Sequence, residues 1–195
     1  MRGLFNGKQT LFLHTDAAKT IQEAVLFAEK MKVRPVIVGG DDAWLVVDFL
    51  KSHNVPVVLS STQRLPSRED EAVDQPFKNA AILQQKGVLF AFSAEGGWRQ
   101  RNLPFMAGQA VGFGLDKEAA ISAMTANTAK ILGLEQRCGT LEAGKDATLF
   151  ISEGDVLDMR TCKVTAAFIQ GREVNLDNKH KQLGRRFEEK YQQKN

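Results

Sequence analysis

The side chains best suited to chemistry lie where short apolar segments of this sequence end. His14 ends TLFLH, Asp41 and Asp42 follow PVIVGG, and Glu95 follows VLFAFSA. Histidines and carboxylates are the groups that bind metal ions or transfer protons. A catalytic zinc site needs three protein ligands and one open position, so His14 alone does not make one. A weaker oxygen-rich metal site, formed by His14 with Asp41, Asp42 and Glu95, is the alternative.

Each of these residues also has a structural interpretation. A histidine at the end of a strand is ordinarily hydrogen-bonded near the cap of the following helix. Thr15 or Asp16 has the right side chain to cap a helix over residues 17–32, and we interpret Asp41 as the cap of the next helix. Trp98, Arg99 and Arg101 follow Glu95 in a loop. Their function is either to bind an anionic ligand or to close that loop.

Strands and helices that alternate must position these residues. Four apolar, β-rich segments, TLFLH, RPVIVGG, VPVVLSS and VLFAF, are separated by helical patterns and by the polar loop TQRLPSREDEAVDQ. Pro76 at the first turn and Gly87 at the end mark the third helix. Strands joined through helices indicate a parallel α/β sheet. Periodicity alone leaves open whether the sheet is doubly wound or half of a (β/α) barrel.

The character of the chain changes after the fourth strand. Residues 103–134 are predicted to be helical, with an interruption at Gly112 and Gly114 and a restart at Asp116. Strands are predicted at 148–151 and 164–170, with glycine turns at Gly144 and Gly171. We therefore divide the chain into an α/β layer (1–135), a small β annex (136–175) and a basic tail helix (176–195). In this tail, Leu183, Phe187 and Tyr191 share one helical face.

Composition excludes several classes of protein. No apolar run reaches the roughly 18 residues of a membrane span, and the first residues lack the apolar core of a signal peptide. From Asp177 onward, six basic residues oppose three acidic ones, so the tail carries the net charge of +3. No nucleic-acid-binding motif accompanies these charges. Cys138 and Cys162 leave one disulfide possible; the compartment is undetermined, with a cytoplasmic location favoured.

One stretch, AAISAMTANTAKILGLEQRCGTLEAGKDATLFI, carries a family signature. It resembles the carboxyl-terminal part of the amidohydrolase superfamily, in particular its imidazolonepropionase-like members, where Thr-x-Asn-Pro-Ala and Leu-Gly precede Gly-x-Leu-x-x-Gly-Lys-x-Ala-Asp. Thr128 replaces the proline and Thr148 the final aspartate. The matching positions are Thr125, Asn127, Ala129, Leu132, Gly133, Gly139, Leu141, Gly144, Lys145, Asp146 and Ala147.

The resemblance runs from about Lys8 to Val174 and implies the second half of a TIM-type (β/α) barrel, followed by a β annex of a composite β-sandwich domain. A complete member would add an earlier β segment and four earlier strands, the first with a His-x-His pair. Family members use divalent metal, usually zinc, to hydrolyse C–N bonds of small molecules. His14 matches the histidine of the fifth strand.

The rest of the implied metal site is incomplete. Gly39 and Gly40 stand where the sixth-strand histidine would lie, and Ala94 replaces the aspartate that serves as general base. Glu95 is adjacent, but neighbouring residues of a strand point to opposite sides. His53 lies at the other end of its strand, and His180 lies in the tail. We therefore expect no metal to be bound by this chain.

The sequence is compatible with three functions. In the first, the chain is part of a metal-dependent hydrolase of cyclic-amide or imidazolone-like C–N bonds and is inactive alone. In the second, it is a non-catalytic scaffold. In the third, it is an α/β module that binds a small ligand through His14, Glu95 and Arg99. Four parallel strands of a barrel leave an apolar inner face uncovered. We expect the missing amino-terminal half or a second copy of the chain to cover it, unless the helices after Leu103 fold over it.

Overall fold

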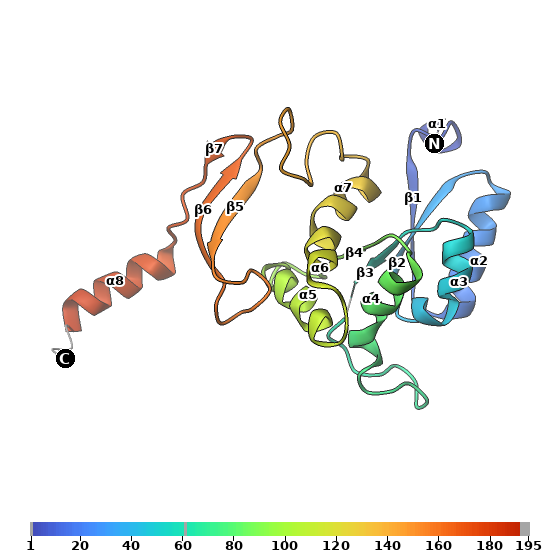
Figure 1. Ribbon diagram of the computed structural model, residues 1–195, viewed down its shortest axis with the longest axis horizontal. Coiled ribbons are helices and arrows are strands. Elements are labelled where there is room, and N and C mark those ends of the chain that lie inside the picture. Colours follow the sequence, from blue (N-terminus) through green and yellow to red (C-terminus); the bar gives the residue numbers. More distant parts are fainter. Residues whose placement is uncertain (1, 61, 192–195) are drawn as a thin grey trace.

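The computed structural model describes residues 2–60 and 62–191. Its main element is a four-stranded parallel sheet with the strand order β1-β2-β3-β4 (Figure 1). The strands are paired in sequence order, as expected when each is joined to the next by a right-handed crossover. Their bounds are β1 Thr10–Thr15, β2 Arg34–Gly39, β3 Val57–Leu59 and β4 Phe90–Phe92. The predicted parallel α/β sheet of about four strands is confirmed.

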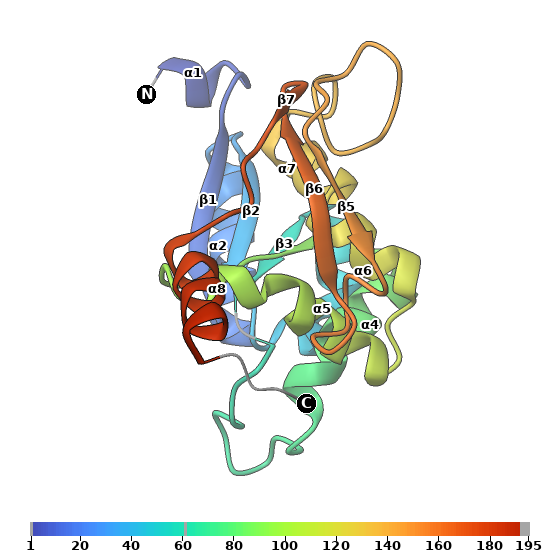
Figure 2. The same cartoon turned by 90° about the vertical axis from the view of Figure 1, so that its left-hand side faces the viewer.

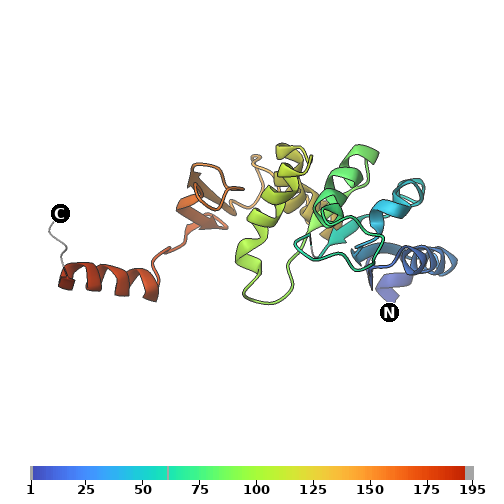
Figure 3. The same cartoon turned by 90° about the horizontal axis from the view of Figure 1, so that it is seen from below.

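Helices cover one face of this sheet, as Figure 3 shows from below. Residues 62–74, which belong to the predicted polar loop, contain neither helix nor strand, as expected. Helix α4 spans Gln75–Lys86; Gly87, in a left-handed conformation, ends it, and Pro76 lies in its first turn, both as expected. The helices that precede β4 are α1 Arg2–Phe5, α2 Ala18–Lys30, the 3₁₀ helix η1 Ala43–Val46, α3 Val47–Ser52 and α4 Gln75–Lys86.

The main hydrophobic core lies between the sheet and helices α2, α3 and α4, and it extends to buried residues between 107 and 123 in the helices that follow β4. Alternate strand residues point toward the helices, and there they meet apolar side chains spaced three or four residues apart. Burial is complete or nearly complete at the centre of this layer. The core includes Ile37, Val57, Leu59, Phe90 and Phe92 from the strands, and Ile21, Val25, Leu50, Ala80 and Leu83 from the helices.

The opposite face of the sheet is only partly covered. A small second cluster joins Val36 and Ala91 to Ile131, which comes from a later helix. On the edge strand β1, Phe12 keeps 38% of its surface exposed and His14 is exposed. A groove of about 1130 Å³ runs along the amino-terminal end of this face, lined in part by Phe12, Val36 and Leu132. Helices after Leu103 thus cover part of the inner face and leave its β1 side open.

Three helices follow β4 and the 3₁₀ helix η2 Gln100–Asn102: α5 Leu103–Gly112, α6 Lys117–Met124 and α7 Ala126–Leu132. The predicted interruption is present, and Asp116 caps α6 by accepting a hydrogen bond from the Ala119 N–H at 2.9 Å. An unpredicted break at Thr125 separates α6 from α7. Asn127 then donates to the Phe90 carbonyl at 3.1 Å, which attaches α7 to strand β4.

The β annex is an antiparallel sheet of β5 Leu149–Glu153, β6 Lys163–Ile169 and β7 Arg172–Glu173. Its first two strands match the predicted segments to within two residues at each end, and Gly171 turns the chain between β6 and β7. Figure 2 shows the long connection from α7 into β5. Cys138 and Cys162 are free thiols, so the possible disulfide does not form.

The tail forms helix α8, Lys179–Tyr191, which projects away from the rest of the chain (Figures 1 and 3). Its apolar stripe is largely exposed, since Phe187 keeps 52% and Tyr191 62% of their surfaces open. The two rings stack 6.0 Å apart. None of the helices in residues 2–60 and 62–191 combines the length and apolar character of a transmembrane segment.

A close backbone contact attaches the annex to the helical layer. Leu157, in the loop after β5, is buried in the main core. Its carbonyl oxygen lies 2.1 Å from the position that a Cβ atom would occupy at Gly108 of α5. Lys117 and Asp155 add an ion pair of 2.7 Å beside this contact. Only glycine therefore allows α5 to pack this closely against the loop.

We predict that Gly108→Ala destabilises the protein by about 1–3 kcal/mol, because the added methyl group overlaps a backbone atom. Gly112→Ala is the matched control in the same helix, where a Cβ atom would meet nothing within 4 Å. That substitution is expected to change stability by less than about 1 kcal/mol, in the stabilising direction. Urea unfolding measures both, and equal stabilities for the two variants would contradict this packing.

Candidate functional site: the carboxyl-terminal edge of the sheet

All four parallel strands end at the same edge of the sheet, the lower edge in Figures 1 and 2. Open α/β sheets and barrels alike place ligand sites at this edge. His14 lies there on β1, with Val38 as its β2 partner. Its side chain is exposed. The residues that follow β2, β3 and β4 decide whether His14 has partners.

Strand β2 cannot present a histidine at its exit in this conformation. Gly39 has φ +105° and Gly40 has φ +68°, values that side chains other than glycine rarely adopt. A Cβ atom at Gly39 would lie 2.3 Å from Asp16 Oδ1, and one at Gly40 would lie 2.8 Å from Val57 Cγ1. Atoms of Asp16 and Val57 therefore fill the space that a metal-binding side chain would need at these two positions.

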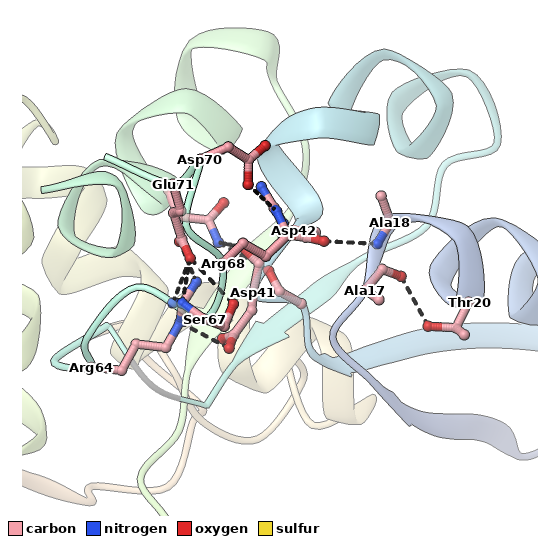
Figure 4. Close-up of polar contacts among 12 residues, drawn as sticks. Ala17, Ala18, Thr20, Asp41, Asp42, Arg64, Ser67, Arg68, Asp70 and Glu71 are labelled. Atoms are coloured by element: carbon pink, nitrogen blue, oxygen red, sulfur yellow. Dashed lines mark hydrogen bonds and ion pairs between the residues drawn. The ribbon is translucent and has the colours of Figure 1, made fainter. Parts of the chain in front are cut away.

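Asp41 does not cap a helix, so that interpretation was wrong. The following 3₁₀ helix begins at Ala43, and no side-chain cap is present. Instead, Asp41 Oδ2 lies 2.8 Å from Nε of Arg64, which comes from the loop after β3. The other edge of the Arg64 guanidinium binds Glu71 in a bidentate pair, with N–O distances of 2.6 and 3.0 Å. Figure 4 shows Arg64 between the two carboxylates.

Glu71 is the most completely enclosed charge of this network. Its side chain has no exposed surface, and it also accepts hydrogen bonds from the Ser67 N–H at 2.7 Å and the Ser67 hydroxyl at 3.2 Å. The hydrogen bonds from Arg64 lower the pKa of Glu71 to about 2, against the opposing effect of burial. Glu71 is therefore a carboxylate over the whole physiological range.

The pKa of Asp41 shifts in the opposite direction. Burial raises the pKa of Asp41, and the nearby negative charges of Asp16 and Glu71 raise it further, while Arg64 lowers it only in part. Burial by itself would lower the pKa of Arg64, but the hydrogen bond to Glu71 and the charge of Asp41 raise it above its usual value. The guanidinium thus remains a permanent cation between two carboxylates.

A second arginine repeats this arrangement beside the first. Arg68 pairs with Asp42 and, at 2.9 Å, with Asp70. The other oxygen of Asp42 accepts a hydrogen bond from the Ala18 N–H at 3.1 Å, so Asp42 satisfies the start of helix α2 from a different strand exit (Figure 4). The predicted cap at Thr15 or Asp16 was therefore wrong. Ala17 is the N-cap and makes no side-chain hydrogen bond.

Glu95 and Arg99 lie together in a separate small cavity of about 280 Å³. Trp98 is 77% exposed, and its ring stacks with the guanidinium of Arg101 at 4.7 Å, outside this cavity. The residues proposed from sequence thus separate into three places: His14 on β1, Asp41 in the arginine network, and Glu95 with Arg99 in the cavity. The cavity is lined by Ser60, Gln63, Ala94, Glu95, Arg99, Asn102 and Met106.

A zinc ion does not fit the donor set of this chain. In the described residues, no three His, Cys, Asp or Glu side chains converge to hold a metal ion. His53 lies at the opposite end of the sheet, where Nε2 is 3.7 Å from Glu29. Arg64 and Arg68 already bind the carboxylates that follow β2. The sequence suggested a weak oxygen-rich metal site that includes Asp41 and Asp42. The carboxylates of these two residues are instead paired with arginines.

The arginine network was not predicted from the sequence. Arg64, Arg68 and Glu71 lie in the polar loop that joins β3 to α4, and nothing local shows that they reach the exit of β2. A usable signal was present, because a loop that leaves the carboxyl edge of a parallel sheet is positioned to contact other strand exits. Two arginines in that loop, opposite Asp41 and Asp42, are complementary in charge.

We predict that Glu71→Gln reduces the loss of stability between about pH 4.5 and pH 2. The pKa of Glu71 is lower in the folded chain than its usual 4.5, so the stabilisation is complete above that value and is lost as the pH falls toward about 2. Its size is about 3 kcal/mol at most. Asp41 has the opposite sign, because its raised pKa makes its ionisation destabilising as the pH rises.

Urea unfolding from pH 6 down to pH 2 measures this difference. Asp70→Asn is the matched control, since its carboxylate is 79% exposed and pairs with Arg68 at the surface, where such pairs contribute about 0–1 kcal/mol. A Glu71→Gln profile that runs parallel to wild type would contradict the assignment.

Comparison with known proteins identifies the lineage of this fold. Residues 11–174 match the family model described as "Amidohydrolase family". The amidohydrolase from Thermotoga maritima MSB8 has 28% sequence identity and a TM-score of 0.80, over 89% of this chain and 45% of that one. A search of curated protein sequences gave no significant match.

More distant structures share the fold alone. A prolidase complexed with N-methylphosphonate-L-proline has 18% identity and a TM-score of 0.64, over 85% of this chain and 45% of that one. An adenosine deaminase from Xanthomonas campestris with bound zinc has 17% identity and a TM-score of 0.61, over 93% and 51%. The chain spans about half the length of these structures. The four strands are thus part of a TIM-type barrel, and the chain belongs to the amidohydrolase family.

Proposed function

We propose that this chain forms the carboxyl-terminal half of a barrel from a metal-dependent amidohydrolase and has no hydrolase activity by itself. The observation that carries this proposal is a family match over residues 11–174 in a chain that spans 45% of the Thermotoga structure. Activity would require a complementary half-barrel to supply the metal ligands that this chain lacks. That half would be another part of the same protein or a separate chain.

The substrate class follows from the sequence resemblance. Imidazolonepropionase-like members act on non-peptide C–N bonds in small rings, and the signature between Ala119 and Ile151 is of that kind. In a completed barrel, His14 is the residue of this chain positioned to contribute one ligand. Zinc would there activate water for hydrolysis. In the described part of this chain alone, the His, Cys, Asp and Glu side chains do not form a site that fits zinc. We therefore assign no reaction step to this chain by itself.

The geometry of the edge also supports a second function, a non-catalytic scaffold of the same lineage. The space beside Gly39 is filled by Asp16, and that beside Gly40 is filled by Val57. The general-base position is Ala94. A complementary half would therefore restore only part of the family's site. These residues favour reduced or altered chemistry even in a complete barrel.

We predict that the purified chain binds no zinc tightly and does not hydrolyse hydantoin-like or imidazolone-like rings. His14→Ala is expected to change neither property, because a single histidine holds zinc too weakly. Metal analysis by mass spectrometry after dialysis against a chelator, together with ring-opening assays at added zinc, makes the measurement. Near-stoichiometric zinc, or a metal-dependent rate that disappears in His14→Ala, would overturn the proposal that the chain alone is inactive.

We also propose that a second copy covers the open inner face when no complementary half is present. The β1 edge and Phe12 form the open part of this face, and closed barrels avoid such edges. A two-fold dimer pairs the same surface of each copy. The exposed apolar stripe of α8 would be a second contact surface.

Sedimentation velocity tests this association. We expect a dimer with a dissociation constant of about 1 μM, the value that an interface of about −8 kcal/mol gives. Phe12→Lys should shift the equilibrium to monomer, while Phe27→Lys should not, since Phe27 is 55% exposed on helix α2. A wild-type chain that remains monomeric up to roughly 100 μM excludes the dimer.

A further inference from the structure

The small cavity at the exits of β3 and β4 has the features of a ligand site of its own. Ser60 follows β3, Ala94 and Glu95 follow β4, and Met106 comes from α5. Its volume of about 280 Å³ lies just below the roughly 300–1,000 Å³ of pockets for drug-sized ligands. The occupant must therefore be small. Polar groups make up most of the lining, with Met106 as the larger apolar side chain.

The two charged residues of this cavity have no ion-pair partner within the described part of the chain. The arginines of the neighbouring network are fully engaged, Arg64 with Asp41 and Glu71, and Arg68 with Asp42. Arg101 stacks on Trp98. By contrast, Glu95 and Arg99 line the same cavity without forming such a pair with each other, so one cation and one anion remain available to a ligand.

We propose that this cavity binds a small α-amino acid. The Arg99 guanidinium would bind the ligand carboxylate, for which its planar fork of donors is well matched, and the Glu95 carboxylate would bind the ammonium group. The side chains of Gln63, Asn102 and Ser60 supply neutral hydrogen-bonding groups. Met106 contacts the short side chain of the ligand, since a thioether adapts to apolar groups of varied shape.

The arginine network holds one wall of this cavity in place. Gln63 directly precedes Arg64, and Arg64 connects its loop to the exit of β2 through Asp41. A wall fixed before binding reduces the entropy lost when the ligand is ordered. The proposed contacts of Arg99 and Glu95 with the ligand involve no metal ion, so they can be tested independently of the hydrolase function proposed above. If the cavity does not bind an amino acid, the proposed hydrolase function is unaffected. If the hydrolase proposal fails, the amino-acid site is likewise unaffected.

Three probes separate the two charge contacts: L-alanine carries both charges, N-acetyl-L-alanine only the carboxylate, and L-alaninamide only the ammonium group. Each is titrated into the ¹⁵N-labelled full chain, with the amide signals of residues 94–102 followed by NMR. We expect L-alanine to saturate with a dissociation constant on the order of 1 mM, and each other probe to bind at least about tenfold more weakly.

Arg99→Gln should abolish saturable binding of L-alanine, and Glu95→Gln should leave L-alanine no tighter than N-acetyl-L-alanine. Arg101→Gln is the matched control, because Arg101 stacks on Trp98 outside the cavity, and it should bind L-alanine as wild type does. The rest of each spectrum reports whether the variant is folded. No saturable shift for L-alanine up to about 20 mM, an unchanged affinity in folded Arg99→Gln, or equal affinities for the three probes overturns the proposal.

Discussion

The carboxyl-terminal edge of the sheet depends on one electrostatic constraint: the carboxylates that meet there must be balanced by nearby positive charge. Parallel strands bring all their exits to one edge, and this sequence places Asp16, Asp41 and Asp42 after β1 and β2. A buried carboxylate without a partner is strongly destabilising. Arg64 and Arg68 provide the balance, and in doing so they attach the loop after β3 to the exit of β2.

This arrangement accounts for the difference between this chain and its metal-dependent family. Where a metal ion carries positive charge at the mouth of a barrel, histidines must reach it; here the guanidinium of Arg64 lies between Asp41 and Glu71 instead. Glycine at the end of β2 is compatible with this arrangement, because Asp16 occupies the space beside Gly39 that a larger side chain would need. The open inner face of the sheet and the small cavity lined by Glu95 and Arg99 are then the surfaces for which we propose binding.

Local signals in the sequence predicted the elements well because they act over a few residues. Gly87 at the end of α4 and Asp116 at the start of α6 have the predicted roles. The role of Asp41 was missed, since its partner Arg64 lies 23 positions further along the chain. Asp42 caps a helix that begins 24 residues earlier. Contacts between strand exits are set by the sheet, so no local pattern reveals them.

A double-mutant cycle shows whether Arg64 holds the exit of β2 through Asp41. The stabilities of wild type, Arg64→Met, Asp41→Asn and the double variant are measured by urea unfolding at pH 7. We expect the two substitutions to be coupled by about 1–3 kcal/mol, as for groups in one charge network. Additive effects, with a coupling below about 0.5 kcal/mol, would contradict it.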